Sequence, residues 1–309
     1  MSKVIGILSG KGGVGKTTLV ANLAASLTND FKKNVIILDS NVTTSHLGLH
    51  LGLYEDLPVT LREVINRKSP LDYAIYIHPQ TGIRLLPAPL NNRDMKFDLD
   101  RFQSIIGTLK KNYDIVLVDT APGLGKEAVV ATNVIDEGII VTTPDLPSVT
   151  DALKTIDLLK RLKKNITGFV INRKKNEKYE LSAEEISSNL ECNLLSIIPE
   201  DNKVPISISR GIPLVIMDGN ASASIAIKIL AGDLVNEKYQ PKGFVYSLKK
   251  MLGLTKDYSD LKNRNQKTIT QNADEKEDVD RLKDEVLQEV KAELKAAVKE
   301  KLKQKMRKK

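Results

Sequence analysis

Residues 10–18 read Gly10-Lys11-Gly12-Gly13-Val14-Gly15-Lys16-Thr17-Thr18. They follow a short apolar run, Val4–Leu8, and open a helical pattern, so they fit the phosphate-binding pattern G-x-x-x-x-G-K-[ST] in its strand-to-helix setting. Glycines let backbone N–H groups converge on phosphate oxygens, and the helix directs the positive end of its dipole at the same anion. Lys16 is expected to reach the β- and γ-phosphates, and the Thr17 hydroxyl to ligate Mg²⁺. The stretch therefore predicts a nucleotide site, with a glycine-rich turn that holds no ligand as the alternative.

Short apolar runs alternate with helical patterns along the first 240 residues. Most runs are continuously apolar, as in strands that are buried on both faces of a parallel sheet. The expected strands are Val4–Leu8, Val35–Leu38, Ile83–Leu86, Ile115–Val118, Gly138–Thr142, Gly168–Ile171 and Leu195–Ile198. The expected helices are Thr17–Thr28, Leu99–Lys111, Leu146–Lys163, Ala183–Glu191 and Ser222–Val235. This order predicts an α/β fold with a doubly wound, mostly parallel sheet of about seven to eight strands, and less regular structure over Gly52–Pro79.

The charge of the 309-residue chain is unevenly distributed. The formal net charge is +8, yet residues 1–240 carry 28 basic and 27 acidic side chains, while residues 241–309 carry 19 and 12. A nearly neutral body with a basic tail indicates two parts with different roles. Cys192 is the single cysteine, which excludes a disulfide scaffold and disfavours iron–sulfur or thiolate metal sites. Because no apolar run reaches the roughly 18–20 residues of a membrane span, and Val4–Leu8 is too short for a signal peptide, a cytoplasmic chain is expected.

A second lysine distinguishes this phosphate loop from an ordinary one. Lys11–Thr17 read KGGVGKT. Here the chain resembles the MinD/ParA family of P-loop ATPases, whose deviant Walker A signature is this string. In that family the first lysine reaches across a dimer interface to the ATP of the partner. The resemblance implies ATP and Mg²⁺ as cofactors, a homodimer with ATP, and catalytic roles for Lys11 and Lys16. A solvated surface charge is the alternative for Lys11.

The resemblance extends to the expected metal ligands. Asp39 ends the second expected strand, where the family places a switch I carboxylate, and Asp119 ends a strand that resembles Walker B. The resemblance implies that Thr17, Asp39 and Asp119 hold Mg²⁺. The family usually has a second aspartate two residues after the first, where this chain has Asn41. Because an amide can position a water molecule but cannot accept its proton, a slow ATPase is expected, with Asn41 as a catalytic residue.

Further residues resemble the base-binding part of the family site. Asn172 resembles the adenine-reading asparagine at a strand end, and Pro199 and Asp201 resemble a second adenine-contacting turn. Asp151 matches the acidic residue that the family sets near its signature lysine. Each match is weak alone, since an aspartate after an apolar strand is often only a helix cap. Their order behind an intact phosphate loop makes the set specific.

The tail after residue 240 contains two different elements. Residues 241–254 predict a short amphipathic helix, with one apolar face formed by Phe244, Val245, Leu248, Met251 and Leu252 and lysines opposite. Such a helix suits an anionic membrane surface, bound through residues 242–253, and resembles the membrane-targeting end of MinD; packing on the body is the alternative. Residues 255–273 are expected to be a linker, and residues 274–309 a charged helical extension. The basic terminus, residues 299–309, leaves lipid, DNA and no partner open.

Taken together, these features favour a MinD-like ATPase with residues 1–240 as the ATPase domain. The expected protein is cytoplasmic and peripherally membrane-associated, dimerises on ATP, hydrolyses it slowly and serves spatial organisation such as division-site placement, with a possible activator protein as partner. A ParA-like partition ATPase that binds DNA nonspecifically and an ATP-binding scaffold without significant hydrolysis are the alternatives. Iron–sulfur carriers of the same fold are disfavoured by the lone Cys192.

Overall fold

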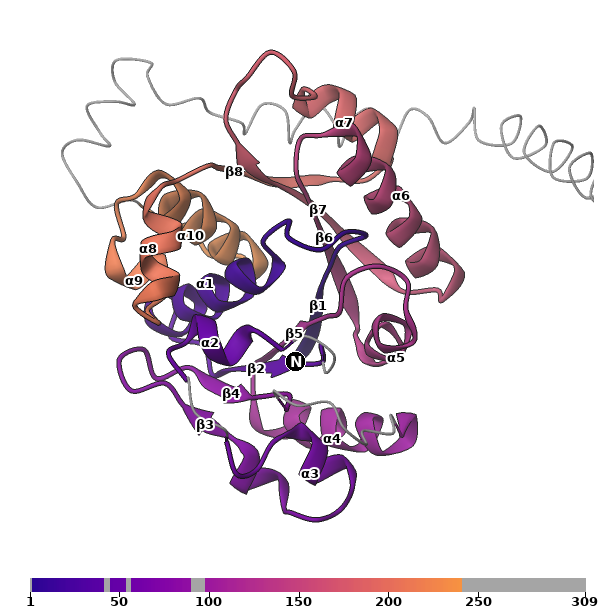
Figure 1. Ribbon diagram of the computed structural model, residues 1–309, viewed down its shortest axis with the longest axis vertical. Helices are drawn as coiled ribbons and strands as arrows, with labels where there is room; N and C mark the ends of the chain where they lie inside the picture. Colours follow the sequence, from indigo (N-terminus) through magenta and orange to yellow (C-terminus); the bar gives the residue numbers. More distant parts are fainter. Residues whose placement is uncertain (1, 42–44, 54–56, 90–97, 241–309) are drawn as a thin grey trace, which may run out of the picture. The chain divides into compact units, whose positions relative to one another are not determined.

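A single mixed sheet forms the centre of the described part of the chain. The computed structural model describes residues 2–41, 45–53, 57–89 and 98–240, and Figure 1 shows their arrangement. The sheet has eight strands in the order β3-β4-β2-β5-β1-β6-β7-β8. Every neighbouring pair is parallel except β3 and β4. The expectation of a doubly wound, mostly parallel sheet is therefore confirmed.

The strands lie close to the apolar runs that predicted them. Their bounds are β1 Lys3–Leu8, β2 Val35–Asp39, β3 Tyr76–Ile77, β4 Arg84–Leu86, β5 Ile115–Asp119, β6 Glu137–Thr142, β7 Asn165–Lys174 and β8 Leu194–Pro199. Successive side chains point to opposite faces of the sheet. In β1, Val4 and Leu8 enter one buried cluster, while Ile5 and Ile7 enter the other. The continuous apolar runs thus reflect burial on both faces.

Helices cover both faces of the sheet and give it two cores. On one face lie α3 Leu61–Ile65, α4 Leu99–Asn112, α5 Lys126–Val134, α6 Leu146–Arg161 and α7 Ala183–Leu190, together with the 3₁₀ helix η1 Leu71–Ala74. On the other face lie α1 Lys16–Asn29, α2 Leu47–His50, α8 Lys203–Ser209, α9 Leu214–Met217 and α10 Ser222–Leu234. Figure 1 shows this division, with α1 and α10 side by side.

Several short elements were not predicted from the sequence. Helix α5 has nine residues and only a weak apolar stripe, while α8 and α9 have seven and four residues. Strand β3 has two residues and pairs at the sheet edge. Segments this short carry little periodicity, so their formation depends on tertiary packing.

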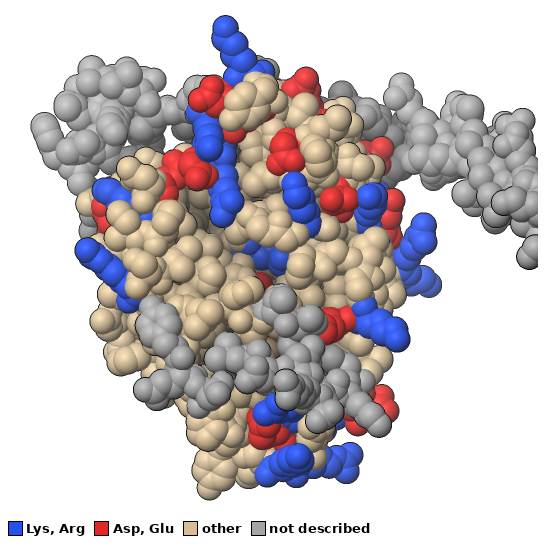
Figure 2. Space-filling view, in the orientation of Figure 1, with Lys and Arg blue, Asp and Glu red and all other residues tan. Residues whose placement is uncertain are grey.

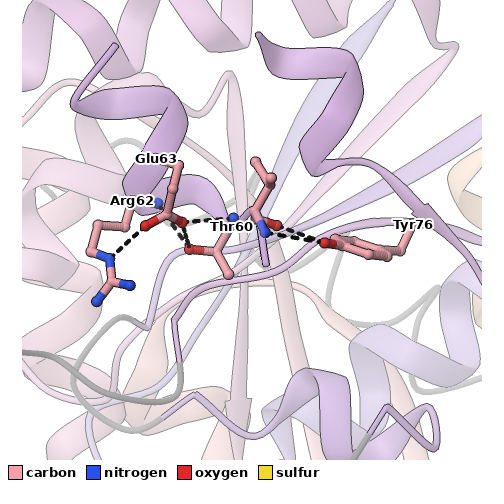
Figure 3. A network of polar contacts seen from close by, with 5 residues as sticks. Thr60, Arg62, Glu63 and Tyr76 are labelled. Atoms are coloured by element: carbon pink, nitrogen blue, oxygen red, sulfur yellow. Dashed lines mark hydrogen bonds and ion pairs between the residues drawn. The ribbon is translucent and has the colours of Figure 1, made fainter. Parts of the chain in front are cut away.

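The irregular segment before β4 is ordered by a polar network around the start of α3. Glu63 accepts hydrogen bonds from the backbone and side chain of Thr60 and from Arg62 Nε at 2.8 Å. The Tyr76 hydroxyl donates to the carbonyl of Val59 at 2.9 Å and so joins β3 to the same turn (Figure 3). This capping box satisfies orphan N–H groups of a helix too short to be stable alone.

The last described residues are fastened to the end of α1. The Tyr239 ring contacts Phe31 edge-to-face at 6.4 Å between centroids, and Lys228 Nζ lies 5.4 Å from the Tyr239 centroid. Lys228 also pairs with Asp30 at 3.2 Å. The expected membrane-facing residues Phe244, Val245, Leu248, Met251 and Leu252, the linker and the extension lie outside the described residues. None of the described helices is long and apolar enough to span a bilayer.

Candidate functional site

The phosphate loop lies between β1 and α1, as its motif predicts. Gly15 precedes α1 with φ 95°, a conformation that favours glycine, and Gly13 has φ 80°. Lys16 is the first residue of α1, is buried, and its Nζ donates to Ser9 Oγ at 2.9 Å. Burial lowers the pKa of Lys16, and the charge of Asp119 opposes that shift. The loop thus holds a desolvated ammonium group at the positive end of a helix, which is an anion-binding arrangement.

Two segments pack on the loop so closely that only glycine fits. A Cβ on Gly10 would lie 2.0 Å from the carbonyl oxygen of Asp151 in α6, and one on Gly15 would lie 2.2 Å from Asn172 Nδ2. The Asn172 amide also donates to the carbonyl of Val14 at 2.7 Å. The loop is therefore shaped by its neighbours as well as by its own sequence.

Asp39 and Asp119 lie side by side at the carboxyl end of the sheet. They are register partners on β2 and β5, with 0% and 2% of their surfaces exposed. Asp39 accepts hydrogen bonds from Ser45 Oγ at 2.7 Å and from the Asn41 backbone N–H at 2.9 Å. Burial raises the pKa of both carboxyl groups, and the neighbouring charge of Asp119 adds to the shift at Asp39. Once both are ionised, two carboxyl groups in this position concentrate negative charge at one site.

Asp119 has an oxygen that the protein leaves unsatisfied. Its Oδ1 is buried and has no hydrogen-bond partner among the described residues, whereas Thr17 donates a side-chain hydrogen bond to this carboxyl group. Hard divalent cations prefer oxygen ligands of this kind. Thr17, Asp39 and Asp119 therefore fit the Mg²⁺ expected from the sequence, because a cation beside Asp119 would satisfy the orphaned oxygen and balance the buried charge.

A cavity of about 310 Å³ lies beside the loop and contains the expected base-binding residues. Asn172, Pro199 and Asp201 line it together with Gly15 and Thr18. The Asp201 carboxylate accepts the backbone N–H of Lys203 at 3.0 Å and that of Ala223 at 3.5 Å, so it also anchors the starts of α8 and α10. The structure thus brings the three residues together with the loop, in a cavity of a size suited to a small ligand.

Lys11 is an exposed residue of the loop, in contrast to the buried Lys16. Half of its side chain is exposed, and Nζ lies 4.0 Å from Asp145 Oδ1. Asp151, which the family resemblance sets near this lysine, lies beside the loop with its backbone against Gly10, while its carboxylate pairs with Lys154 at 2.8 Å. Asp145, the N-cap of α6, is a second acidic residue near Lys11.

A second cavity of about 310 Å³ opens above Lys11. It is lined by the loop, by Asp145, by Arg173 near the end of β7 and by Tyr179 from the segment after it. Figure 2 shows basic and acidic side chains interspersed on the face drawn, without one dominant sign. The lining of this cavity is likewise mixed, with Lys11, Arg173 and Lys175 beside Asp145, Glu180 and Glu200.

Four contacts of the site were missed from the sequence. Ser9 holds Lys16, Ser45 holds Asp39, Asp145 faces Lys11, and His50 contacts Thr18 at 3.3 Å. Only Ser9, adjacent to the motif, carried a signal that could have identified it. Asn41 is buried beside Asp39, as its spacing from that residue implies.

Comparison with known proteins agrees with this geometry. The CobQ/CobB/MinD/ParA nucleotide binding domain matches residues 5–214. An uncharacterised ATP-binding protein of Methanocaldococcus jannaschii is 36% identical over 241 residues, which are 78% of this chain and 90% of that protein.

Solved structures share both fold and sequence with the chain. The septum site-determining protein MinD of Pyrococcus horikoshii, complexed with Mg-ADP, has a TM-score of 0.71 and 32% identity, covering 76% of this chain and 96% of that one. A chain of the MinC:MinD cell division protein complex of Aquifex aeolicus has a TM-score of 0.71 and 32% identity, covering 78% and 99%. The chain therefore belongs to the CobQ/CobB/MinD/ParA family of nucleotide-binding domains, as a MinD-like member.

Proposed function

We propose that the chain is a MinD-like ATPase that dimerises on ATP and binds a membrane surface in a nucleotide-dependent manner. ATP and Mg²⁺ are the cofactors. The observation that carries the proposal is the buried Oδ1 of Asp119, for which the described part of the chain offers no hydrogen-bond partner, beside Thr17 and a desolvated Lys16. A phosphate loop with this acidic neighbour is suited to a nucleotide–Mg²⁺ complex and poorly suited to a bare anion.

Each part of the site has a role in this proposal. Backbone N–H groups of Gly10–Thr18 and the Lys16 ammonium bind the phosphates, and Lys16 exchanges its hydrogen bond to Ser9 for a phosphate oxygen. Thr17, Asp39 and Asp119 hold Mg²⁺, which neutralises phosphate charge when bound. Asn172, Pro199 and Asp201 form the wall that receives the base.

Lys11 acts in the dimer. Its half-exposed side chain and its 4.0 Å separation from Asp145 leave the ammonium group free to reach the nucleotide of a second copy. Lys11→Ala should therefore weaken ATP-dependent dimerisation while Mg·ADP binding to the monomer stays within about threefold, since a surface ion pair contributes little. Light scattering with ATP and calorimetry with ADP measure the two effects. If Lys11→Ala weakened dimerisation and ADP binding equally, Lys11 would act on the nucleotide bound by its own copy.

Hydrolysis should be slow because Asn41 cannot act as a base. Asn41→Asp should raise turnover of Mg·ATP if this position orients water, since a carboxylate can also accept the proton. The assay is phosphate release by purified full-length protein. Tight ATP binding with no turnover in either protein would favour the scaffold alternative, and an unchanged or lower rate in Asn41→Asp would remove the position from the reaction.

Membrane attachment is assigned to residues 242–253. One short amphipathic helix binds weakly, so an ATP-dependent dimer would present two and gain avidity. The test is sedimentation with anionic liposomes: the full chain should pellet better with ATP than with ADP, and Phe244→Glu should abolish the difference. Equal pelleting in all cases contradicts the switch, and ATP-dependent retention on DNA instead would favour the ParA-like alternative.

Division-site placement is the process that we propose. The structural likeness to a chain of the MinC:MinD cell division complex supports it, and a partner that activates hydrolysis is part of the proposal. Deletion of the protein tests this proposal, because its loss should displace the division site. The spatial distribution of the tagged protein in dividing cells is the second measurement.

A further inference from the structure

A histidine outside the nucleotide motifs contacts the phosphate loop. His50 ends α2, which packs against α1, and its Nε2 lies 3.3 Å from Thr18 Oγ1. Thr18 lies in the first turn of α1 and lines the cavity beside Gly15. A nucleotide with its phosphates in the loop and its base in that cavity must pass Thr18 where phosphate and sugar meet.

The other ring nitrogen of His50 determines which way this hydrogen bond runs. Nδ1 lies 2.9 Å from the carbonyl oxygen of His46. A carbonyl only accepts, so Nδ1 carries the proton. In the neutral ring Nε2 is then the acceptor, and the Thr18 hydroxyl donates its hydrogen to His50. In the protonated ring both nitrogens are donors, so Nε2–H donates to Thr18 Oγ1 and the hydroxyl hydrogen is released.

The two states of His50 therefore present different groups to a bound nucleotide. With neutral His50, Thr18 offers only oxygen lone pairs toward the phosphates, which is unfavourable for an anion. With protonated His50, Thr18 can donate to a phosphate oxygen and a positive charge stands behind it. We infer that His50 is a positioning residue that couples nucleotide binding to proton uptake through the Thr18 hydroxyl. The inference rests on the proposed nucleotide site.

The surroundings of His50 are consistent with a neutral ring in the free protein. Burial lowers the pKa of His50, the hydrogen bond to the His46 backbone opposes this, and the charge of His46 lowers it further. Helix α2 packs against α1 and α8, whose own charged residues are Lys16 and Lys203; Asp30, Asp201 and Arg210 lie next to the ends of these helices. Because neither helix itself carries a carboxylate, an incoming phosphate is a group that can raise the pKa of His50.

Linkage fixes the sign of the effect. If nucleotide raises the pKa of His50, protonation must raise nucleotide affinity by the same factor. A rise of about one pKa unit corresponds to a limit of about tenfold in affinity. Affinity should therefore increase as pH falls through the pKa of His50 and level off below it.

The experiment measures Mg·ADP affinity of the full chain by calorimetry from pH 5.5 to 8.5. The terminal phosphate of ADP also titrates in this range, so the result is the ratio of wild-type to His50→Gln affinity, from which ligand titration cancels. The ratio should fall about tenfold between low and high pH. His78→Gln is the matched control, because His78 is a buried histidine that bonds Gly211 and Thr81 and should leave the pH dependence intact.

A second readout does not depend on the variants. The chain has three histidines, so three imidazole signals can be followed by NMR. One pKa should rise by about one unit on addition of Mg·ADP, and Thr18→Val should abolish that rise. A constant affinity ratio together with unchanged histidine pKa values in nucleotide-bound protein overturns the inference, whereas failure of the wild type to bind Mg·ADP overturns the proposed function itself.

Discussion

Asn172 connects the end of β7 to the phosphate loop, and its replacement by alanine tests what that connection does. The amide donates to the Val14 carbonyl at 2.7 Å, lies against Gly15 and lines the cavity beside the loop. Removing it leaves the carbonyl without this donor, and orphaning a partly buried polar group costs about 1–3 kcal/mol. For a domain of this size, each kcal/mol lost from the free energy of unfolding lowers Tm by about 2–4 °C.

The larger consequence is expected in binding. Without the amide the loop loses a brace and the cavity loses a directional polar group, so Mg·ADP affinity should fall about tenfold, equivalent to about 1.4 kcal/mol, and the preference for ADP over GDP should narrow. Calorimetry with both nucleotides measures these effects, and differential scanning calorimetry of the nucleotide-free chain measures Tm.

Asn29→Ala is the matched control for Asn172→Ala. The Asn29 amide donates to the carbonyl oxygen of Thr81 at 3.0 Å, at the end of α1 opposite the loop. It should lower Tm to a similar extent and leave both affinities unchanged. If Asn172→Ala lowers Tm but keeps its affinity and its preference for ADP, the residue only supports the loop, and its assignment to the base site is wrong.

Three other predictions concern packing and ionisation. Gly10→Ala should destabilise the chain by about 3 kcal/mol or more, because the new Cβ would meet the backbone of Asp151. Gly12→Ala, whose Cβ would lie 3.9 Å from its nearest neighbour, should cost less than about 1 kcal/mol. Equal Tm values for the two variants would contradict this prediction. Burial raises the pKa of the Cys192 thiol to about 12, against the opposing charge of a nearby lysine, so only about one thiol in 10⁴ is ionised at pH 8. A disulfide reagent should therefore react with Cys192 at least about a hundredfold faster in the urea-unfolded chain than in the folded chain. Similar rates in the folded and unfolded chain would disprove the burial argument. Phe102→Ala should cost about 3–5 kcal/mol, seen as a lower urea midpoint, since the ring is fully buried, and an unchanged midpoint would mean that the core collapses to fill the space.

The elements that the sequence predicted well are those with a strong local signal. Strand β5 was expected at Ile115–Val118 and is found at Ile115–Asp119, because an unbroken apolar run buried on both faces admits few alternatives. Helix α5 was missed because its nine residues expose much of their surface and only Ala128, Ala131, Thr132 and Val134 are buried. Such a helix forms because the crossover from β5 to β6 requires it.

The site shows the same division between local and tertiary information. The loop could be assigned from consecutive residues, whereas the contact of Asp39 with Asp119 depends on β2 pairing with β5, which no spacing along the chain reveals. Asp145 and Asp151 differ by less than two helical turns, so the choice of neighbour for Lys11 depends on where α6 begins. His50 could not be connected to Thr18 without the packing of α2 on α1.

The contacts of Tyr239 and Lys228 with the end of α1 fix the distance between this point and the phosphate loop. Helix α1 begins at the phosphate loop and spans 14 residues, so its two ends are roughly 20 Å apart. A fluorophore attached at Tyr239 would report on a labelled nucleotide at a separation suited to energy transfer. Because a single rigid helix sets that short separation, transfer within one copy is nearly complete, and the approach of a second copy on ATP has to be followed between differently labelled copies.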